Sequence, residues 1–168
     1  MTINATGRST QWISNNMRAV RSKDSKAERR IRSALHRLGF RFKKHANLPG
    51  RPDILFVSAK TAVFVDGDFW HGRVLIENGE DVLKQTFRSA KADWWIAKIK
   101  ATVQRDREID RVLHTLGYVT LRLWERDILA DTDRAAQMIK QVLIHRRALI
   151  RSHSESSKPT RDSLSPNC

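Results

Sequence analysis

Two aspartates stand beside neighbouring apolar runs, and a simple pairing of those runs would bring their carboxylates together. Asp53 begins the run 53–57, and Asp66 directly follows the run 61–65. If the two runs form a hairpin, both carboxylates lie at the same end of it. Oxygen ligands of this kind suit Mg²⁺, which polarises a phosphate and lowers the pKa of a bound water. Strand-end aspartates also serve as turn formers and helix caps, so that interpretation stays open.

Two aromatic residues and a histidine come directly after these acids. Phe69, Trp70 and His71 lie in a polar stretch, residues 66–84, that we expect to be a loop. A histidine titrates near neutral pH, so His71 could act as a general base or acid in hydrolysis. The aromatic side chains could stack on bases or wedge between them. The alternative buries Phe69 and Trp70 in the core and leaves His71 as a hydrogen-bonded structural residue.

The chain is strongly basic. Its 168 residues include 32 Lys and Arg against 18 Asp and Glu, which gives a formal net charge of +14. Such a surplus favours a polyanionic partner, and double-stranded DNA is the first candidate. Basic residues gather around the expected first helix, where they would contact phosphates or form an ordinary solvated face: Arg18, Arg21, Lys23, Lys26, Arg29, Arg30 and Arg32.

Cysteine usage and hydropathy exclude several classes of protein. The one cysteine is Cys168, so the fold holds neither a disulfide framework nor a cysteine-ligated zinc site. No apolar run is long enough to span a bilayer, and no signal-peptide hydrophobic region follows Met1. We therefore expect a cytoplasmic, nucleoid-associated protein.

The elements that must position these residues follow from apolar spacing and capping signals. Ser25 and Glu28 form a capping-box pattern ahead of a helix that ends near Gly39. There follow a short strand at 40–42, the hairpin, a helix at 93–116, a strand at 118–124 and a last helix at 134–151. This order predicts an α/β fold with a mixed sheet flanked by helices. We place one domain at 17–151, between a flexible polar arm at 1–16 and a disordered serine-rich tail at 152–168.

Several motifs resemble the very-short-patch-repair (Vsr) endonucleases over about residues 17–128. The matching segments are MRAVRSKDSKAE at 17–28, ALHRLGFRF at 34–42, LPGRPDILF at 48–56, AVFVDGDFWHG at 62–72, WIAKI at 95–99, Arg105-Asp106 and LRLWE at 121–125. That family is similar in fold to type II restriction enzymes and nicks one DNA strand beside a T·G mismatch with Mg²⁺. The resemblance therefore implies a restriction-endonuclease-like core and a Mg²⁺-dependent nicking enzyme of very short patch repair.

The resemblance also implies roles for individual residues. Asp53 would be the main metal ligand, and Asp66, where some members carry a histidine, would be a second. His71 would be the catalytic histidine, and Asp106 would orient it. Glu28 holds the position of an acid near the metal, although its capping role explains it equally well. The aromatic residues that wedge into the duplex beside the mismatch would be Phe69, Trp70 and Trp95.

The chain departs from the family around the expected loop. Members commonly carry a structural zinc bound by cysteines and a histidine, but the corresponding positions here hold Asp68, Arg73, Leu75 and Arg126. These residues form no zinc-thiolate set, so we expect no structural zinc. We hypothesise that Asp68 pairs with Arg126, shared with Arg73, and clips the loop to the strand end. Independent surface charges are the alternative.

Segment 73–91 also lacks the family's usual loop pattern, which leaves mismatch specificity open. One alternative function is a nuclease that cuts foreign or modified DNA in restriction or phage defence. Another is an inactive DNA-binding module, and the intact Asp53, His71 and Asp106 argue against it. We expect a monomer whose partners, besides DNA, are other repair or defence proteins.

Overall fold

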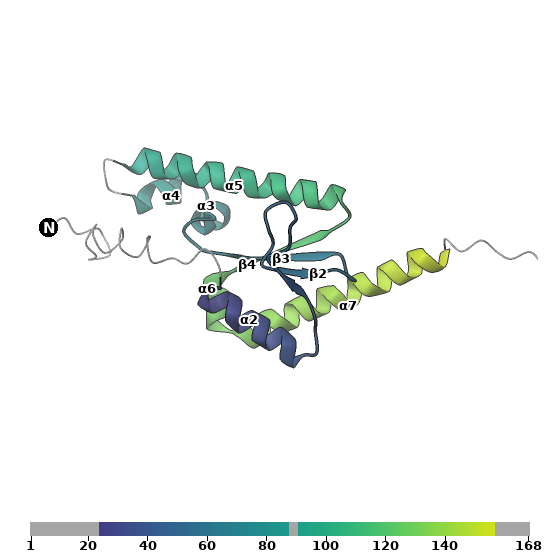
Figure 1. The fold of residues 1–168 in the computed structure, drawn as a ribbon. Coiled ribbons are helices and arrows are strands. Elements are labelled where there is room, and N and C mark those ends of the chain that lie inside the picture. The colour runs from purple at the N-terminus through teal and green to yellow at the C-terminus, as the bar shows by residue number, and fades with distance from the viewer. Residues whose placement is uncertain (1–23, 88–90, 157–168) are drawn as a thin grey trace, which may run out of the picture.

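The computed structural model describes residues 24–87 and 91–156, which form a mixed four-stranded sheet between two layers of helices (Figure 1). The sheet order is β1-β2-β3-β4, in which β2 pairs antiparallel with β1 and β3, and β4 runs parallel to β3. The elements are α2 (Lys26–Arg37), β1 (Lys43–Lys44), β2 (Ile54–Phe56), β3 (Thr61–Asp66), α3 (Arg73–Asn78), α4 (Glu80–Thr86), α5 (Ala92–Thr115), β4 (Val119–Trp124), α6 (Glu125–Ala130) and α7 (Thr132–Ser156). The expected α/β class is confirmed.

Both faces of the sheet are covered, because successive strand residues point to opposite sides. Ile54, Phe56 and Val63 pack with α2, α6 and α7 in one core. Leu55, Ala62 and Phe64 face the other way and pack against α5. Figure 1 shows α5, α3 and α4 on one side of the sheet and α2, α6 and α7 on the other. Within the described residues, no helix is both long and apolar enough to cross a membrane.

Helix α2 begins as its sequence predicts. The hydroxyl of Ser25 accepts a hydrogen bond from the backbone N–H of Glu28, and the Glu28 carboxylate accepts one from the N–H of Ser25. This reciprocal cap satisfies two donors that the first turn leaves unpaired. The buried face of the helix carries Ile31 and Leu35, which are fully enclosed in the core.

Two local predictions are wrong. Residues 40–42 form no strand: Phe40 donates its N–H to Leu35 O at the end of α2, and its ring packs against Phe56. The expected loop at 66–84 instead contains α3 and α4. These short helices form because Leu75 and Leu83 bury against Ile99 and its neighbours on α5, a tertiary contact that local sequence does not reveal.

The C-terminal part also differs from the prediction. A short helix, α6, precedes α7, and the Asp131 carboxylate accepts the N–H of Arg134 near the start of α7. Helix α7 continues to Ser156, past the expected end at residue 151, since no proline or glycine interrupts it before Pro159. The arm at 1–16 and residues 157–168 of the predicted tail lie outside the described residues.

Gly72 allows the segment after His71 to lie directly on α5. Its φ is +69°, and a Cβ at this position would come within 2.8 Å of side-chain carbons of Ile99 and Val103. Real Cβ atoms do not approach so closely, so any other residue would push the segment away from the helix.

The ion pairs that hold the segment after β3 centre on Arg73 and not on Arg126; we call Arg73 and its three carboxylate partners the ionic clip. The Nη1 atom of Arg73 lies 2.9 Å from Asp68 Oδ1 and 2.7 Å from Asp127 Oδ1, and its Nε donates to Glu77 at 2.9 Å. Arg126 contributes its backbone N–H to Asp68 at 3.3 Å, so the expected side-chain pair between these two residues is wrong. The guanidinium of Arg73 reaches from α3 to the loop before it and to α6.

We expect the ion pair between Arg73 and Asp127 to couple α3 to α6 energetically. In urea unfolding, Arg73→Ala combined with Asp127→Ala should cost less stability than the two single changes summed. The exposed pair Glu108–Arg111, 2.6 Å apart within α5, is the matched control and should be close to additive. Additive effects at Arg73 and Asp127 would show that the ion pair between them contributes nothing to stability.

Candidate nuclease site

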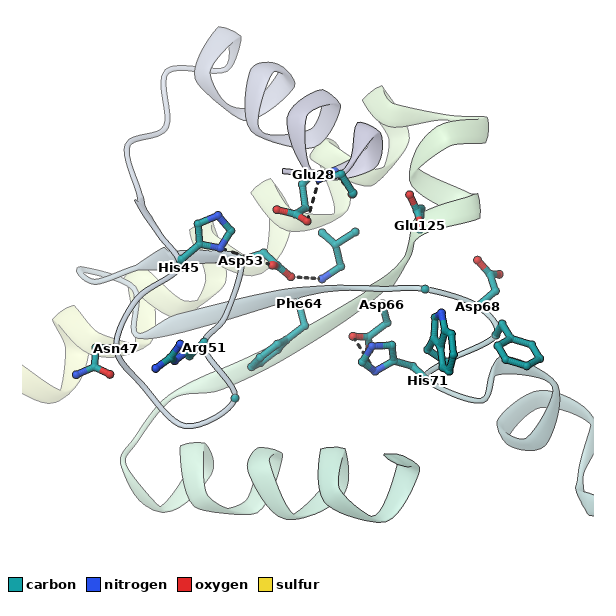
Figure 2. Close-up of a pocket in the computed structure, with 16 residues that line it drawn as sticks. Glu28, His45, Asn47, Arg51, Asp53, Phe64, Asp66, Asp68, His71 and Glu125 are labelled. Carbon is teal, nitrogen blue, oxygen red and sulfur yellow. Dashed lines mark hydrogen bonds and ion pairs between the residues drawn. The ribbon is translucent and has the colours of Figure 1, made fainter. Parts of the chain in front are cut away.

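Four of the five predicted catalytic residues, Glu28, Asp53, Asp66 and His71, line one open cavity of about 750 Å³ beside the end of β3. The fifth, Asp106, lines a second cavity of about 340 Å³ that shares His71 with the first. The first cavity is bounded by the start of α2, the loop before β2, the end of β3 and the segment that follows. Figure 2 shows Glu28 and His45 on the α2 side of this cavity and His71 on the α5 side, with Asp53 and Asp66 between them.

His71 and Asp106 form a hydrogen-bonded pair, as expected. The Nδ1 atom of His71 lies 2.7 Å from Asp106 Oδ2, although the residues are 35 positions apart. Burial raises the pKa of Asp106, but the hydrogen bond to His71 and the charge of Arg122 outweigh it, so the pKa lies below its usual value. An ionised carboxylate can only accept, so the proton of His71 sits on Nδ1 and Nε2 is left free to accept another.

Asp66 lies beside this pair and belongs to a second ionic contact. Its buried carboxylate accepts hydrogen bonds from Arg122 Nη1 at 3.0 and 3.2 Å and lies 3.4 Å from His71 Nδ1. Burial raises the pKa of Asp66, and the charges of His71 and Arg122 oppose that rise. Arg122 also binds both carboxylate oxygens of Asp110 and donates to the backbone carbonyl of Asp106. Its guanidinium therefore links β3 to α5 beside His71.

Asp53 has a different environment. Its Oδ2 accepts the N–H of Val65 at 2.7 Å, while its Oδ1 accepts no hydrogen bond from the described residues. Burial, together with the nearby charges of Glu28 and Asp66, raises the pKa of Asp53 to about 6, against the opposing effect of the Val65 hydrogen bond. A partly buried carboxylate with a free oxygen and no guanidinium partner is suited to a cation.

The expected convergence of Asp53 and Asp66 is only partial. Both residues line the cavity, but Asp66 turns toward His71, whereas Asp53 turns toward His45 and Glu28 (Figure 2). Asp66 also pairs with Arg122. The role of Asp66 as a second metal ligand therefore stays a prediction, and its contacts favour a role in holding His71.

Glu28 does two things at once. Its carboxylate caps α2 and accepts Arg32 Nη1 at 3.1 Å, and the residue also lines the cavity on the side of Asp53. Arg32 only partly offsets the charge of Glu28, which still contributes to the raised pKa of Asp53.

The expected wedge residues form a cluster at the surface rather than in the core. The ring centroids of Phe69, Trp70 and Trp95 are 5.2–5.7 Å apart, and Phe69 remains 42% exposed. Trp94, which is 55% exposed, extends the cluster at 4.7 Å from Trp95, with the ammonium of Lys98 over its ring. Such a surface offers base-stacking area next to a positive charge.

The basic residues around α2 are placed only in part. Arg29 and Arg30 are exposed, and their guanidinium groups donate to the backbone carbonyls of Asp24 and Leu129. Arg18, Arg21 and Lys23 lie outside the described residues. Arg32 is buried and pairs with Asp24 and Glu28, so phosphate contact by Arg32 is wrong. For the other basic residues phosphate contact stays a prediction.

Sequence reasoning gave no role to three residues of this region: His45, Trp94 and Arg122. Trp94 directly precedes a predicted wedge residue, and its exposure was the missing information. Arg122 stands at a polar position of an alternating strand, which is typical of a solvent-facing side chain. It is partly buried instead, because α5 covers that face.

Comparison with known proteins identifies the family of this chain. The family model described as DNA mismatch endonuclease Vsr matches residues 9–76. The type II nicking enzyme V.NmeDIP of Neisseria meningitidis serogroup C is 32% identical over 134 residues, which cover 79% of this chain and 86% of that protein. The DNA mismatch endonuclease Vsr of Escherichia coli strain K12 is 33% identical over 113 residues, or 67% of this chain and 68% of that protein. The chain, with its histidine–aspartate pair beside a buried aspartate, therefore belongs to the Vsr family of DNA endonucleases.

Proposed function

We propose that this Vsr-family endonuclease nicks one strand of duplex DNA beside a T·G mismatch, with Mg²⁺ bound at Asp53 and His71 transferring the proton. The observation that carries the proposal is His71, held by Asp106, in the same cavity as Asp53, whose Oδ1 accepts no hydrogen bond from the described residues. A relative named as a DNA mismatch endonuclease supports the choice of substrate.

The residues present fit a divalent cation. Vsr-like endonucleases are generally metal-dependent, and Asp53 offers Oδ1 from a partly buried carboxyl whose pKa is raised to about 6. Neighbouring carboxylates that repel one another hold a cation well, and hard oxygen ligands with room for waters favour Mg²⁺. When bound, the ion supplies polarisation of the phosphate and a lowered pKa for the attacking water.

His71 is arranged to move a proton at Nε2. Asp106 and Asp66 lie 2.7 and 3.4 Å from Nδ1, which fixes the ring and leaves Nε2 as the acceptor in the cavity. Asp66 accordingly acts as a positioning residue for the imidazole. An inactive DNA-binding module is not favoured, since such a module has no need of this arrangement.

The surface cluster of Phe69, Trp70, Trp94 and Trp95 supports the proposed mismatch substrate. Unstacking a base step costs a few kcal/mol and costs least where pairing is already poor. A cluster that gains about 1–3 kcal/mol per stacked base would therefore bind a mismatched step more readily than a matched one.

The central test is nicking of a labelled duplex that carries one T·G pair, with Mg²⁺ or with EDTA. Asp53→Asn and His71→Ala should each lower the rate, the latter by ~10²–10⁴-fold, because a positioned proton-transfer group is lost. DNA affinity should stay within a few-fold, since neither change removes a phosphate-binding cation. Asp133→Asn and His114→Ala, at exposed positions of α7 and α5, are the controls. Wild-type nicking by Asp53→Asn would contradict the metal assignment.

Stability should depend on pH through Asp53. Its pKa is raised from 3.8 to about 6 in the folded state, so the fold holds this proton more tightly than the unfolded chain does. The contribution of Asp53 to the free energy of unfolding therefore falls as pH rises from 4 to 6 and is constant above that. In EDTA, Asp53→Asn should be more stable than wild type above pH 6, by at most about 3 kcal/mol, and equal to it below pH 4.

Urea unfolding of both proteins from pH 4 to pH 8 checks this, with the exposed Asp133→Asn as a control whose difference from wild type stays flat. A stability difference for Asp53→Asn that does not change with pH would show that Asp53 ionises in the fold as it does in the unfolded chain.

Trp70 allows a test of the wedge. Trp70→Ala should lose the preference for a T·G duplex over a matched duplex in competition binding, whereas Trp70→Phe should keep most of it because a flat ring remains. Circular dichroism confirms folding of both variants. If Trp70→Ala discriminates as well as wild type, the aromatic cluster does not read the mismatch.

A further inference from the structure

His45 occupies an unexplained position next to the proposed metal ligand. It lies just after β1 with a left-handed backbone (φ +46°), and its ring faces Asp53 and Glu28 (Figure 2). Its Nδ1 is 4.0 Å from Asp53 Oδ1, and its Nε2 is 3.9 Å from Asp24 Oδ1. The Nε2 atom is buried and has no hydrogen-bond partner among the described residues. The Nδ1 atom, which faces Asp53, is likewise too far from it for a hydrogen bond, so it is free to bind a cation.

The free oxygen of Asp53 is the atom that faces this imidazole. Oδ2 is committed to the Val65 N–H, so Oδ1 remains for a cation. Metal bonds to carboxylate oxygen and imidazole nitrogen are each about 2.0–2.2 Å long, so two ligands of one ion can stand up to about 4.4 Å apart. The observed 4.0 Å is too long for a hydrogen bond but within reach of one shared ion.

Asp24 and Glu28 also lie near His45, and their oxygens and an imidazole nitrogen all fall within 4.8 Å of one another. Arg32 already pairs with both carboxylates, however, through Nη2 to Asp24 and through Nη1 to Glu28 at 3.1 Å. A divalent cation among these three residues would sit against the guanidinium charge. The geometry therefore favours the Asp53 side of His45 for a cation, with the ring proton on Nε2, which is 3.9 Å from Asp24 Oδ1.

We propose that His45, through Nδ1, is a ligand of the same cation as Asp53, which makes the centre a mixed nitrogen–oxygen site that binds Mn²⁺ more tightly than Mg²⁺. This inference rests on the proposed function only in taking Asp53 as a metal ligand. Carboxylate and water ligands suit Mg²⁺ and Mn²⁺ alike, whereas an imidazole nitrogen favours the transition metal. Activity with either ion follows from the oxygen ligands, and the preference between the ions comes from His45.

Binding of each ion alone to the full chain, without DNA, tests the proposal. Free Mn²⁺ is measured by electron paramagnetic resonance and Mg²⁺ by calorimetry, for wild type and for His45→Asn. Asparagine tolerates the left-handed backbone, but its shorter side chain cannot replace the nitrogen ligand. We expect Mn²⁺ affinity to fall by ~10-fold or more in His45→Asn. Mg²⁺ affinity should change by less than about 3-fold, because the oxygen ligands that suit Mg²⁺ remain.

Two further measurements keep the result decisive. His114→Asn, an exposed histidine near the end of α5, should bind both ions as wild type does, and Asp53→Asn should lose both. Pulsed electron paramagnetic resonance of Mn²⁺ bound to the wild type should show a nitrogen coupling that disappears in His45→Asn. No nitrogen coupling in the wild type, or equal Mn²⁺ affinities in wild type and His45→Asn, would overturn the proposal.

The outcomes also separate this inference from the proposed function. Mn²⁺ binding that depends on His45 in a protein that cuts no DNA would leave the site in place and reject the nuclease proposal. If the protein nicks DNA but His45→Asn binds Mn²⁺ as wild type does, the nuclease proposal stands and His45 is not a metal ligand.

Discussion

The parallel pairing of β3 with β4 is the contact on which the site depends. It sets Phe64 opposite Arg122 and Asp66 opposite Trp124, so the Arg122 guanidinium lies over the Phe64 ring and reaches Asp66. Strands that run parallel need a long crossover, and here the crossover contains α5, which carries Asp106 and Asp110. Arg122 thus binds Asp66 on β3 and Asp110 on α5, and the crossover from β3 to β4 brings these two elements together. A buried charge network of this kind is stable only when each member has a partner.

The distribution of positive charge separates the acids of the site into two groups. Arg122 neutralises Asp66 and Asp110, and Arg32 neutralises Glu28, so these carboxylates are fixed in place by permanent cations. Asp53 has only a histidine beside it among the described residues, and burial raises its pKa to about 6. The proposed cation would bind at this unmatched carboxylate. Without a cation, the fold must hold a partly buried acid that no arginine or lysine neutralises.

The sequence predicts the elements whose signals are local and fails where a tertiary contact decides. The predicted features are local in sequence. They are the capping box of Ser25 and Glu28, the hairpin that joins β2 to β3 and the apolar spacing of α5. Helices α3 and α4 were missed because they have no side-chain caps and are held by packing on α5. His71 and Asp106 were paired through family resemblance, since no spacing rule joins residues so far apart. Arg122 was missed because the alternation of its strand does not say which face a distant helix will cover.

The position of His71 is set more by packing than by charge. Arg73 joins three carboxylates, but several of these groups are exposed and water weakens their attraction. Gly72 is different, because it lies in contact with Ile99 and Val103, where any displacement would open a gap in a close-packed interface. Ile99, Val103 and Asp106 are spaced by four and three residues and so share one face of α5. The helix face that seats the backbone after His71 therefore also presents the carboxylate that binds its ring, and one rigid element fixes both.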